Sequence, residues 1–271
     1  MRITIEDLLK FDRETVTKKI LDFIKYHYEN SGVKKLIVGV SGGVDSSTTV
    51  YLCTRAVGPE NIIALIMPDS RTTPEVDIKD AIDLVSALKI EYRIIYIDEL
   101  VDQFSEKVSS SFGRELSYKT VGNIRARTRA VLLYTVANEF NGLVVGASDK
   151  SELLIGYFTK YGDGAVDILP LGDLYKTQVR ALAVYLGVPE RIAYKPSSPR
   201  LWPGHMAEEE LGVRYEEVDL VLHAVFDRGI EPERVPEVTG VPKKVVDKVL
   251  EMVRTTEHKR RTPPIAKIFT T

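Results

Sequence analysis

The segment SGGVDSS, residues 41–47, places glycines, hydroxyls and one aspartate between an apolar run at 36–40 and a helix-like segment. A strand, a glycine turn and a helix start direct several backbone N–H groups and the positive end of a helix dipole at one point, which suits phosphate. The segment has no lysine, and Asp45 would repel phosphate unless a divalent cation lay between them. It therefore predicts a site for ATP with Mg²⁺; the alternative is an ordinary turn rich in small residues.

Three more short apolar runs, at 62–67, 92–97 and 143–147, predict strands that are buried on both faces. Helical periodicity near 75–89, 99–111 and 122–140 separates these runs. The alternation predicts an α/β fold, a doubly wound parallel sheet with flanking helices. Ligands of such sheets bind beyond the carboxyl ends of the strands, so we expect SGGVDSS and the SDKSE segment at 148–152 to converge on one crevice.

The remaining chain predicts one domain over residues 1–271, because this length can bury a single large core. Residues 195–212 combine Pro, Gly and Ser without periodicity, which is typical of a long loop and suggests a lid. Two helices, near 215–228 and 242–256, are expected within a helical C-terminal segment at 213–271.

Composition excludes several classes of partner. Charged residues make up 28% of the chain with a net charge of -2, so neither nucleic acid nor a membrane surface is expected as the main partner. No apolar stretch approaches the roughly 20 residues of a membrane span, and acidic residues near the start argue against a secretory signal. We expect a cytoplasmic protein with a small partner, in which the single cysteine, Cys53, is buried in a helix.

Further motifs follow in order along the chain: NIRARTR at 123–129, GASDKSE at 146–152, GYFTKYGDG at 156–164, LYKTQ at 174–178 and EHKR at 257–260. SGGVDSS resembles the pyrophosphate-binding loop of the ATP pyrophosphatases, and all the motifs together resemble the ammonia-dependent NAD synthetase family. The resemblance extends over almost the whole chain. It implies that ATP activates the nicotinate carboxylate of deamido-NAD as an adenylate, releasing pyrophosphate, and that ammonia then displaces AMP to form NAD.

The resemblance also implies a set of ATP and metal contacts. Asp45 and Glu152 match the acidic ligands of Mg²⁺, and Lys176 matches a lysine at the ATP phosphates. The residues expected at ATP are Gly39, Val40, Ser41, Gly42, Gly43, Val44, Asp45, Ser46, Ser47, Arg71, Lys176 and Ser197, with Arg71 on the adenine side.

A second set is expected at the dinucleotide. By the same resemblance, the deamido-NAD contacts are Arg127, Lys160, Asp167, His258 and Lys259, and the aromatic Phe158 is expected beside them. Basic side chains suit the anionic pyrophosphate and carboxylate of this substrate, and Phe158 offers a stacking surface. Asp163, in a glycine-rich loop, is the candidate for positioning ammonia or a second Mg²⁺. The family is homodimeric, which implies that the first helix, Tyr134 and the EHKR tail lie near an interface.

Two positions depart from the family pattern. Ala147 stands where many members carry a threonine that binds ATP, and His205-Met206-Ala207 replace a Gln-Thr-Asp run in the lid. Two alternatives stay open: another ATP-pyrophosphatase-type enzyme, such as an amidotransferase synthetase subunit or a tRNA-modifying enzyme, and a nonenzymatic nucleotide-binding regulator.

Overall fold

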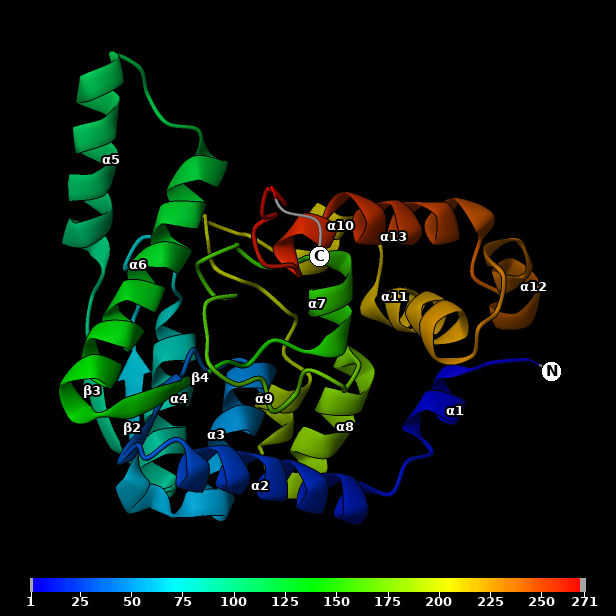
Figure 1. Cartoon of the computed structure of the whole chain (residues 1–271), viewed down its shortest axis with the longest axis horizontal. Coiled ribbons are helices and arrows are strands. Elements are labelled where there is room, and N and C mark those ends of the chain that lie inside the picture. Colours follow the sequence, from blue (N-terminus) through cyan, green and yellow to red (C-terminus); the bar gives the residue numbers. More distant parts are fainter. Residues whose placement is uncertain (1, 269–271) are drawn as a thin grey trace.

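Four short parallel strands form the sheet, as the computed structural model of the chain shows (Figure 1). The structure describes residues 2–268, so Met1 and residues 269–271 of the expected 1–271 domain lie outside the described residues. The strands are β1 (Lys35–Gly39), β2 (Ile62–Ile66), β3 (Glu91–Ile94) and β4 (Gly142–Val145), in the order β3-β2-β1-β4. The predicted parallel α/β sheet is confirmed.

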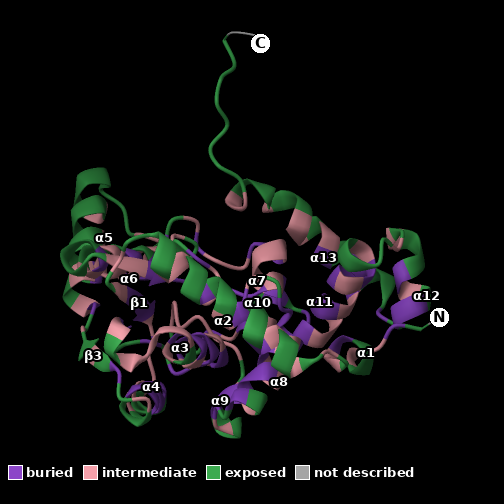
Figure 2. Cartoon of the chain, turned by 60° about the horizontal axis from the view of Figure 1, so that its bottom comes forward, coloured by how far each residue is buried: buried purple, intermediate pink, exposed green. Residues whose placement is uncertain are grey.

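Helices cover both faces of this sheet (Figures 1 and 2). One face packs against α2 (Arg13–Asn30), α3 (Val44–Val57), α4 (Glu75–Ala87), α8 (Lys176–Leu186) and α9 (Glu190–Ala193). The other packs against α5 (Asp98–Phe112) and α6 (Tyr118–Phe140). Side chains alternate across a strand, so Leu36 and Val38 enter the first core while Ile37 enters the second.

The third predicted strand differs from the prediction. Residues 92–97 were expected to be buried on both faces, but β3 ends at Ile94, which is exposed, and Tyr96 beyond it is exposed too. The strand lies at the edge of the sheet and pairs with β2 alone. An edge strand has fewer neighbours to bury its side chains, so its apolar residues remain partly in contact with water.

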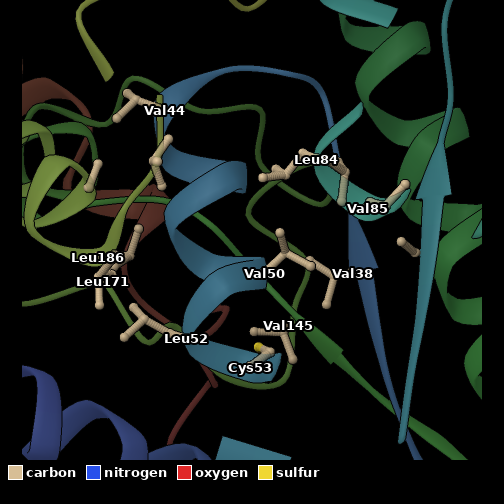
Figure 3. Packing of buried hydrophobic residues seen from close by; sticks show 14 of the residues in the cluster. Val38, Val44, Val50, Leu52, Cys53, Leu84, Val85, Val145, Leu171 and Leu186 are labelled. Carbon is tan, nitrogen blue, oxygen red and sulfur yellow. The ribbon is translucent and has the colours of Figure 1, made fainter. Parts of the chain in front are cut away.

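Helix α3 is the centre of the larger core (Figure 3). Val50, Leu52 and Cys53 are fully buried there, which confirms the predicted burial of Cys53. Burial raises the pKa of the Cys53 thiol to about 12, so the thiol stays protonated and unreactive at neutral pH.

A third core lies among the C-terminal helices and the N-terminal turn. It is formed by α1 (Ile5–Leu9), α7 (Lys150–Ile155), α10 (Ala207–Leu211), α11 (Tyr215–Leu222), α12 (Val235–Thr239) and α13 (Lys243–Thr255). Helix α10 interrupts the loop that was predicted at 195–212, and the helix predicted at 215–228 changes to a π-helical turn at His223–Asp227. Short 3-10 turns occur at Pro59–Asn61, Pro232–Arg234 and Glu257–Lys259. None of the helices within residues 2–268 is long and apolar enough to cross a membrane.

Candidate active site

The candidate site is a cavity of about 470 Å³ at the carboxyl ends of the strands. The chain leaves β1 for β2 and β3 on one side and later returns to β4 on the other, which makes β1 and β4 the switch point of the sheet. Residues from both SGGVDSS and GASDKSE line the cavity, so these two segments converge as expected. Residues 156–166 and 195–202 contribute to the same wall.

The SGGVDSS loop is held in shape by its own hydroxyls. Ser46 Oγ accepts a hydrogen bond from the backbone N of Ser41 at 3.1 Å and donates to the carbonyl of Gly43 at 3.2 Å. No side chain caps the N-terminus of α3, so N–H groups of its first turn remain for a ligand. Gly42 has a φ of 77°, and a Cβ there would lie 2.2 Å from the carbonyl oxygen of Asp77.

Gly42→Ala should weaken ATP binding, because alanine disfavours the left-handed backbone by about 1–2 kcal/mol and its Cβ must also push the loop away from α4. Isothermal titration with ATP and thermal unfolding measure the two effects. Gly32→Ala is the matched control, since Gly32 has a φ of 69° with nothing within 4 Å of an added Cβ. The control should lose a little stability and keep its ATP affinity; equal ATP affinities in the two variants would contradict the prediction.

A buried lysine joins three carboxylates beside this loop. Lys176 Nζ lies 2.7 Å from Asp45 Oδ2, 2.8 Å from Glu152 Oε1 and 2.9 Å from Asp149 Oδ2. The side chains of Lys176 and Asp149 have no solvent exposure. The structure thus brings Asp45 and Glu152 together although 107 positions separate them. Lys176, which was expected at the ATP phosphates, lies behind the cavity wall rather than in it.

The charges in this cluster are mutually dependent. Burial opposes the charge on Lys176, but Asp149, Asp45 and Glu152 outweigh burial and hold the pKa of Lys176 well above its usual value. Burial raises the pKa of Glu152 and of Asp149, while Lys176 acts to lower both. One ammonium cannot neutralise three carboxylates, so the cluster favours a further cation.

The hydrogen bonding of Asp45 also favours a role as a metal ligand. Its Oδ1 atom is buried and has no hydrogen-bond partner, while its Oδ2 atom contacts Lys176. Among residues 2–268, however, no group of three or more His, Cys, Asp or Glu side chains is placed to hold a metal. Asp45 and Glu152 therefore fit Mg²⁺ only as part of a shell that phosphate oxygens complete.

Helix starts position the acidic side chains. Asp149 is the N-cap of α7 and accepts a hydrogen bond from the backbone N of Glu152 at 2.8 Å. Ser151 Oγ accepts from the backbone N of Lys176 at 2.9 Å and donates to Asp219 at 2.5 Å. Burial raises the pKa of Asp219 to about 7. Asp149 was missed in the sequence although it lies in SDKSE as a helix-capping residue, and no motif points to Asp219.

The residues expected at the dinucleotide divide into two groups. Phe158 and Lys259 line the cavity together with Asp163, the separate candidate for ammonia or a second Mg²⁺. Lys259 Nζ donates to the carbonyls of Gly156 and Phe158 at 2.7 Å. Outside the cavity lining, Arg127 contacts the Lys160 carbonyl at 3.3 Å, and Lys160 Nζ contacts the His258 carbonyl at 2.8 Å. These last three residues form one basic strip, in which Arg127 and His258 are exposed and Lys160 is half-buried.

Asp167, the sixth residue of this set, is exposed and does not line the cavity. Its carboxylate accepts hydrogen bonds from Tyr134 Oη at 3.0 Å and from the backbone N of Val144 at 2.8 Å. Asp163 is exposed as well, and its Oδ1 accepts from the backbone N of Thr159 at 2.9 Å. This contact joins Asp167, which was expected at deamido-NAD, to Tyr134, which the resemblance placed near a subunit interface.

The expected ATP contacts outside the glycine loop also divide. Ser197 lines the cavity, and its buried hydroxyl has no partner among the described residues. Arg71 does not line the cavity, because its guanidinium is held by Asp69 and Asp102. Within the glycine loop, Gly42 and Ser47 are buried behind the lining residues.

The lid residues that differ from the family pattern form contacts that the sequence did not predict. His205 is buried, stacks on Trp202 with ring centroids 3.4 Å apart, and places Nε2 2.8 Å from Glu210 Oε2. Tyr157 Oη donates to the same Glu210 oxygen at 3.0 Å. These four side chains tie residues 202–210 to the loop after α7. Ala147, the other departure, lines the cavity with no polar group.

Asp69, at the carboxyl end of β2, stabilises the fold next to the site by an amount that depends on pH. Burial opposes its charge, but hydrogen bonds from Arg71 and Arg125 outweigh burial and lower the pKa of Asp69 to about 2. The ionised carboxylate therefore contributes stability at pH values above about 4, and this contribution is lost as pH falls toward 2. Asp69→Asn should lower the free energy of unfolding at pH 7, by an amount that shrinks between pH 4 and pH 2. Urea titrations across this range measure it; a pH-independent difference would contradict the assignment.

A glycine-rich turn and two converging carboxylates at the switch point of a parallel sheet define a nucleotide-binding α/β protein with the adenine nucleotide alpha hydrolase-like fold. Residues 16–263 match the family model described as NAD synthase. The chain belongs to the NAD synthase family, as its motifs predicted.

Individual relatives agree with this placement. The chain is 54% identical to the NH(3)-dependent NAD(+) synthetase of Hyperthermus butylicus, over 97% of this chain and 94% of the relative. It is similar to the solved NMN synthetase of Francisella tularensis, with a TM-score of 0.83, 32% identity, and coverage of 96% and 100%. It is also similar to the solved NH3-dependent NAD synthetase of Campylobacter jejuni, with a TM-score of 0.79, 30% identity, and coverage of 95% and 100%.

Proposed function

We propose that this protein is a ligase that amidates deamido-NAD to NAD with ammonia and ATP, releasing AMP and pyrophosphate. The observation that carries the proposal is the meeting of Asp45 and Glu152 around Lys176, beside a glycine loop that shares one cavity with Phe158 and Asp163. A nucleotide-binding regulator has no need for a buried carboxylate with an unpartnered oxygen at the phosphate loop.

The reaction needs two displacements at one place. An oxygen of the nicotinate carboxylate attacks the α-phosphorus of ATP, the bond from this phosphorus to the bridging oxygen breaks, and pyrophosphate leaves. The ammonia nitrogen then attacks the acyl carbon, the carbon–oxygen bond breaks, and AMP leaves, while the nitrogen gives up a proton to solvent. The adenylate is needed because a free carboxylate accepts a nucleophile poorly. The protein supplies alignment and charge stabilisation for both steps.

At the phosphate end, the first turn of α3 and the hydroxyls of Ser41 and Ser46 would receive the β and γ phosphates. Asp45 and Glu152 would hold Mg²⁺, which when bound neutralises the triphosphate and the departing pyrophosphate. Lys176 fixes both carboxylates in place from behind the cavity wall. The unpartnered hydroxyl of Ser197 is free to contact the nucleotide.

At the acceptor end, Phe158 and Lys259 on the cavity wall would contact the pyridine ring and its charged neighbours. The basic strip of Arg127, Lys160 and His258 would extend this contact toward the dinucleotide pyrophosphate. The negative charge of Asp163 would hold an ammonium ion, and the ammonium would then lose a proton to become the ammonia that attacks. We also infer a cytoplasmic homodimer whose interface includes α2 and the contact between Tyr134 and Asp167.

The test is a reaction of the purified protein with Mg²⁺, ATP, deamido-NAD and ammonium, followed for NAD, AMP and pyrophosphate. We expect all three products in equal amounts and little NAD when glutamine replaces ammonium. Formation of ADP, or ATP cleavage that does not depend on the dinucleotide, would overturn the proposal.

A second candidate activity comes from the similarity to the solved NMN synthetase, which has the higher TM-score of the two solved structures above. This neighbour forms a mononucleotide, so nicotinate mononucleotide is the competing acceptor. Equal concentrations of the two acceptors in one reaction decide between them. We expect NAD to form in excess, because the basic strip extends beyond the cavity toward a second nucleotide half.

A further inference from the structure

The arginines of NIRARTR have three different surroundings, and within residues 2–268 Arg125 alone of the three forms an ion pair. Arg125 and Arg129 are four residues apart on α6 and therefore share a face of the helix, whereas Arg127 is on another face and exposed. Arg125 is buried and forms an ion pair with Asp69 at 2.7 Å. Arg129 lines the cavity.

Arg129 is anchored through one nitrogen only. Its Nε donates to the carbonyl of Met67, at the end of β2, at 2.9 Å. Its two terminal nitrogens form no hydrogen bond or ion pair with any residue in 2–268. Burial lowers the pKa of Arg129 to about 10, although the nearby carboxylates of Asp69 and Asp163 act to raise it. The guanidinium remains a cation at neutral pH.

The other cations of the cavity wall are already engaged within the described chain. Lys119, Lys195 and Arg200 each form an ion pair with a carboxylate. Lys259 donates to two backbone carbonyls. Arg129 therefore differs from them in presenting a charged fork whose outer donors have no protein acceptor.

The surroundings of Arg129 favour binding of an anion between the phosphate end and the acceptor end of the cavity. The lining that α6 contributes is apolar at Ala126, Ala130 and Leu133 and polar at Lys119 and Asn123. Its apolar part strengthens a charge interaction at Arg129 by excluding water. Phe158 and Asp163 of the acceptor end line the same cavity as the SGGVDSS loop. A planar guanidinium with two free donors matches the geometry of a carboxylate or a phosphate.

We propose that Arg129 binds the oxyanion at the reacting end of the substrates, either the α-phosphate of ATP or the nicotinate carboxylate that attacks it. This inference rests on the proposed function for the identity of the two anions. In this role Arg129 would bring two negative groups into contact and stabilise the charge that builds up on the α-phosphate during adenylation. Arg127, which the sequence placed at deamido-NAD, is outside the cavity and would act only on more distant parts of the substrate.

The first test is deamido-NAD-dependent exchange of labelled pyrophosphate into ATP by Arg129→Gln and Arg129→Lys. We expect the exchange rate of Arg129→Gln to fall about 10²-fold and that of Arg129→Lys to fall less, because lysine keeps the charge without the fork. Arg93→Gln is the control: Arg93 is exposed on β3 and pairs with Glu91, and its rate should not change. A rate for Arg129→Gln within twofold of the wild-type rate would overturn the inference.

The second test separates the two anions and also a merely structural role. Titrations compare AMP with adenosine and deamido-NAD with NAD, since each pair differs in the proposed anion. Loss of the preference for AMP in Arg129→Gln would assign Arg129 to the phosphate, and loss of the preference for deamido-NAD would assign it to the carboxylate. If both preferences persist, or if both members of each pair weaken alike, the inference is wrong.

Failure of the proposed function is recognised separately. If the wild-type protein forms no NAD, the proposed function fails, whereas the AMP and adenosine titrations still test Arg129. Arg129→Lys, which keeps a positive charge but lacks the guanidinium fork, provides the same comparison if Arg129→Gln does not fold. Thermal unfolding of each variant shows whether its binding data come from folded protein.

Discussion

Lys176→Met is expected to lower the free energy of unfolding by about 3–5 kcal/mol at pH 8, because removal of one partner leaves buried charges uncompensated. Lys176 has no exposed side-chain area and contacts Asp45, Asp149 and Glu152. Methionine has a similar length, so loss of packing contributes little. Urea unfolding followed by circular dichroism measures the change.

The same variant should have a characteristic pH dependence. Burial already raises the pKa of Asp149 and Glu152, and loss of the ammonium raises both further. An acid whose folded pKa lies above its unfolded pKa stabilises the fold at low pH and loses this contribution as pH rises through the folded value. The destabilisation should therefore be smaller at pH 5 than at pH 8.

Lys79→Met is the matched control, since Lys79 pairs with Asp83 on the exposed face of α4. Exposed pairs of this kind contribute about 0.3–0.5 kcal/mol, so the control should stay close to the wild type. Equal losses in both variants, or a loss in Lys176→Met that is the same at pH 5 and pH 8, would contradict the role of the buried cluster.

The fold could be predicted where one local pattern determines the environment. Residues 36–40 and 62–66 are continuous apolar runs, and they form the two central strands with both faces buried. Residues 92–97 have a similar composition, but the order of strands in the sheet places β3 at the edge. Strand order depends on how the whole chain packs, and a single run of residues does not contain it.

The candidate site, like the fold, could be predicted where a local motif determines it and not where it depends on the packing of distant helices. Asp45 and Glu152 each follow a strand in a recognisable motif, and their proximity follows from the rule that the carboxyl ends of parallel strands share one edge. The burial of Lys176 depends on how α8 packs against α3 and α11, which no local spacing specifies. For the arginines the sequence analysis named Arg127 alone, although the helical spacing of NIRARTR already puts Arg125 and Arg129 on a shared face and Arg127 on another.

The contacts of the lid could not have been found from the sequence. His205, Glu210 and Tyr157 come together across 53 positions, and each pairs with another because the loop after α7 lies against α10. Histidine, glutamate and tyrosine are common on surfaces, so their types alone indicate nothing. The replacement of the family's Gln-Thr-Asp run marked the segment as unusual without predicting these partners.

Asp45→Asn and Glu152→Gln are each expected to reduce pyrophosphate release about 10²–10³-fold, the range seen when one charge-stabilising group of a reaction centre is removed. Each change keeps the shape of the side chain and removes one negative charge next to the proposed Mg²⁺. The unpartnered Oδ1 of Asp45 makes this residue the more sensitive of the two. The fold should persist, because Lys176 keeps two carboxylate partners in either variant.

A metal role and an electrostatic role for these carboxylates differ in their response to Mg²⁺. If Asp45 and Glu152 bind the metal, each variant should need a higher Mg²⁺ concentration for half-maximal pyrophosphate release. Asp173→Asn, which removes a carboxylate that is 98% exposed and pairs with Lys150, should change neither the rate nor the Mg²⁺ requirement. Normal pyrophosphate release by either cluster variant would contradict the assignment. A reduced rate with an unchanged Mg²⁺ requirement would place the carboxylates beside the reaction without the metal, since ligand loss must weaken binding of the ion.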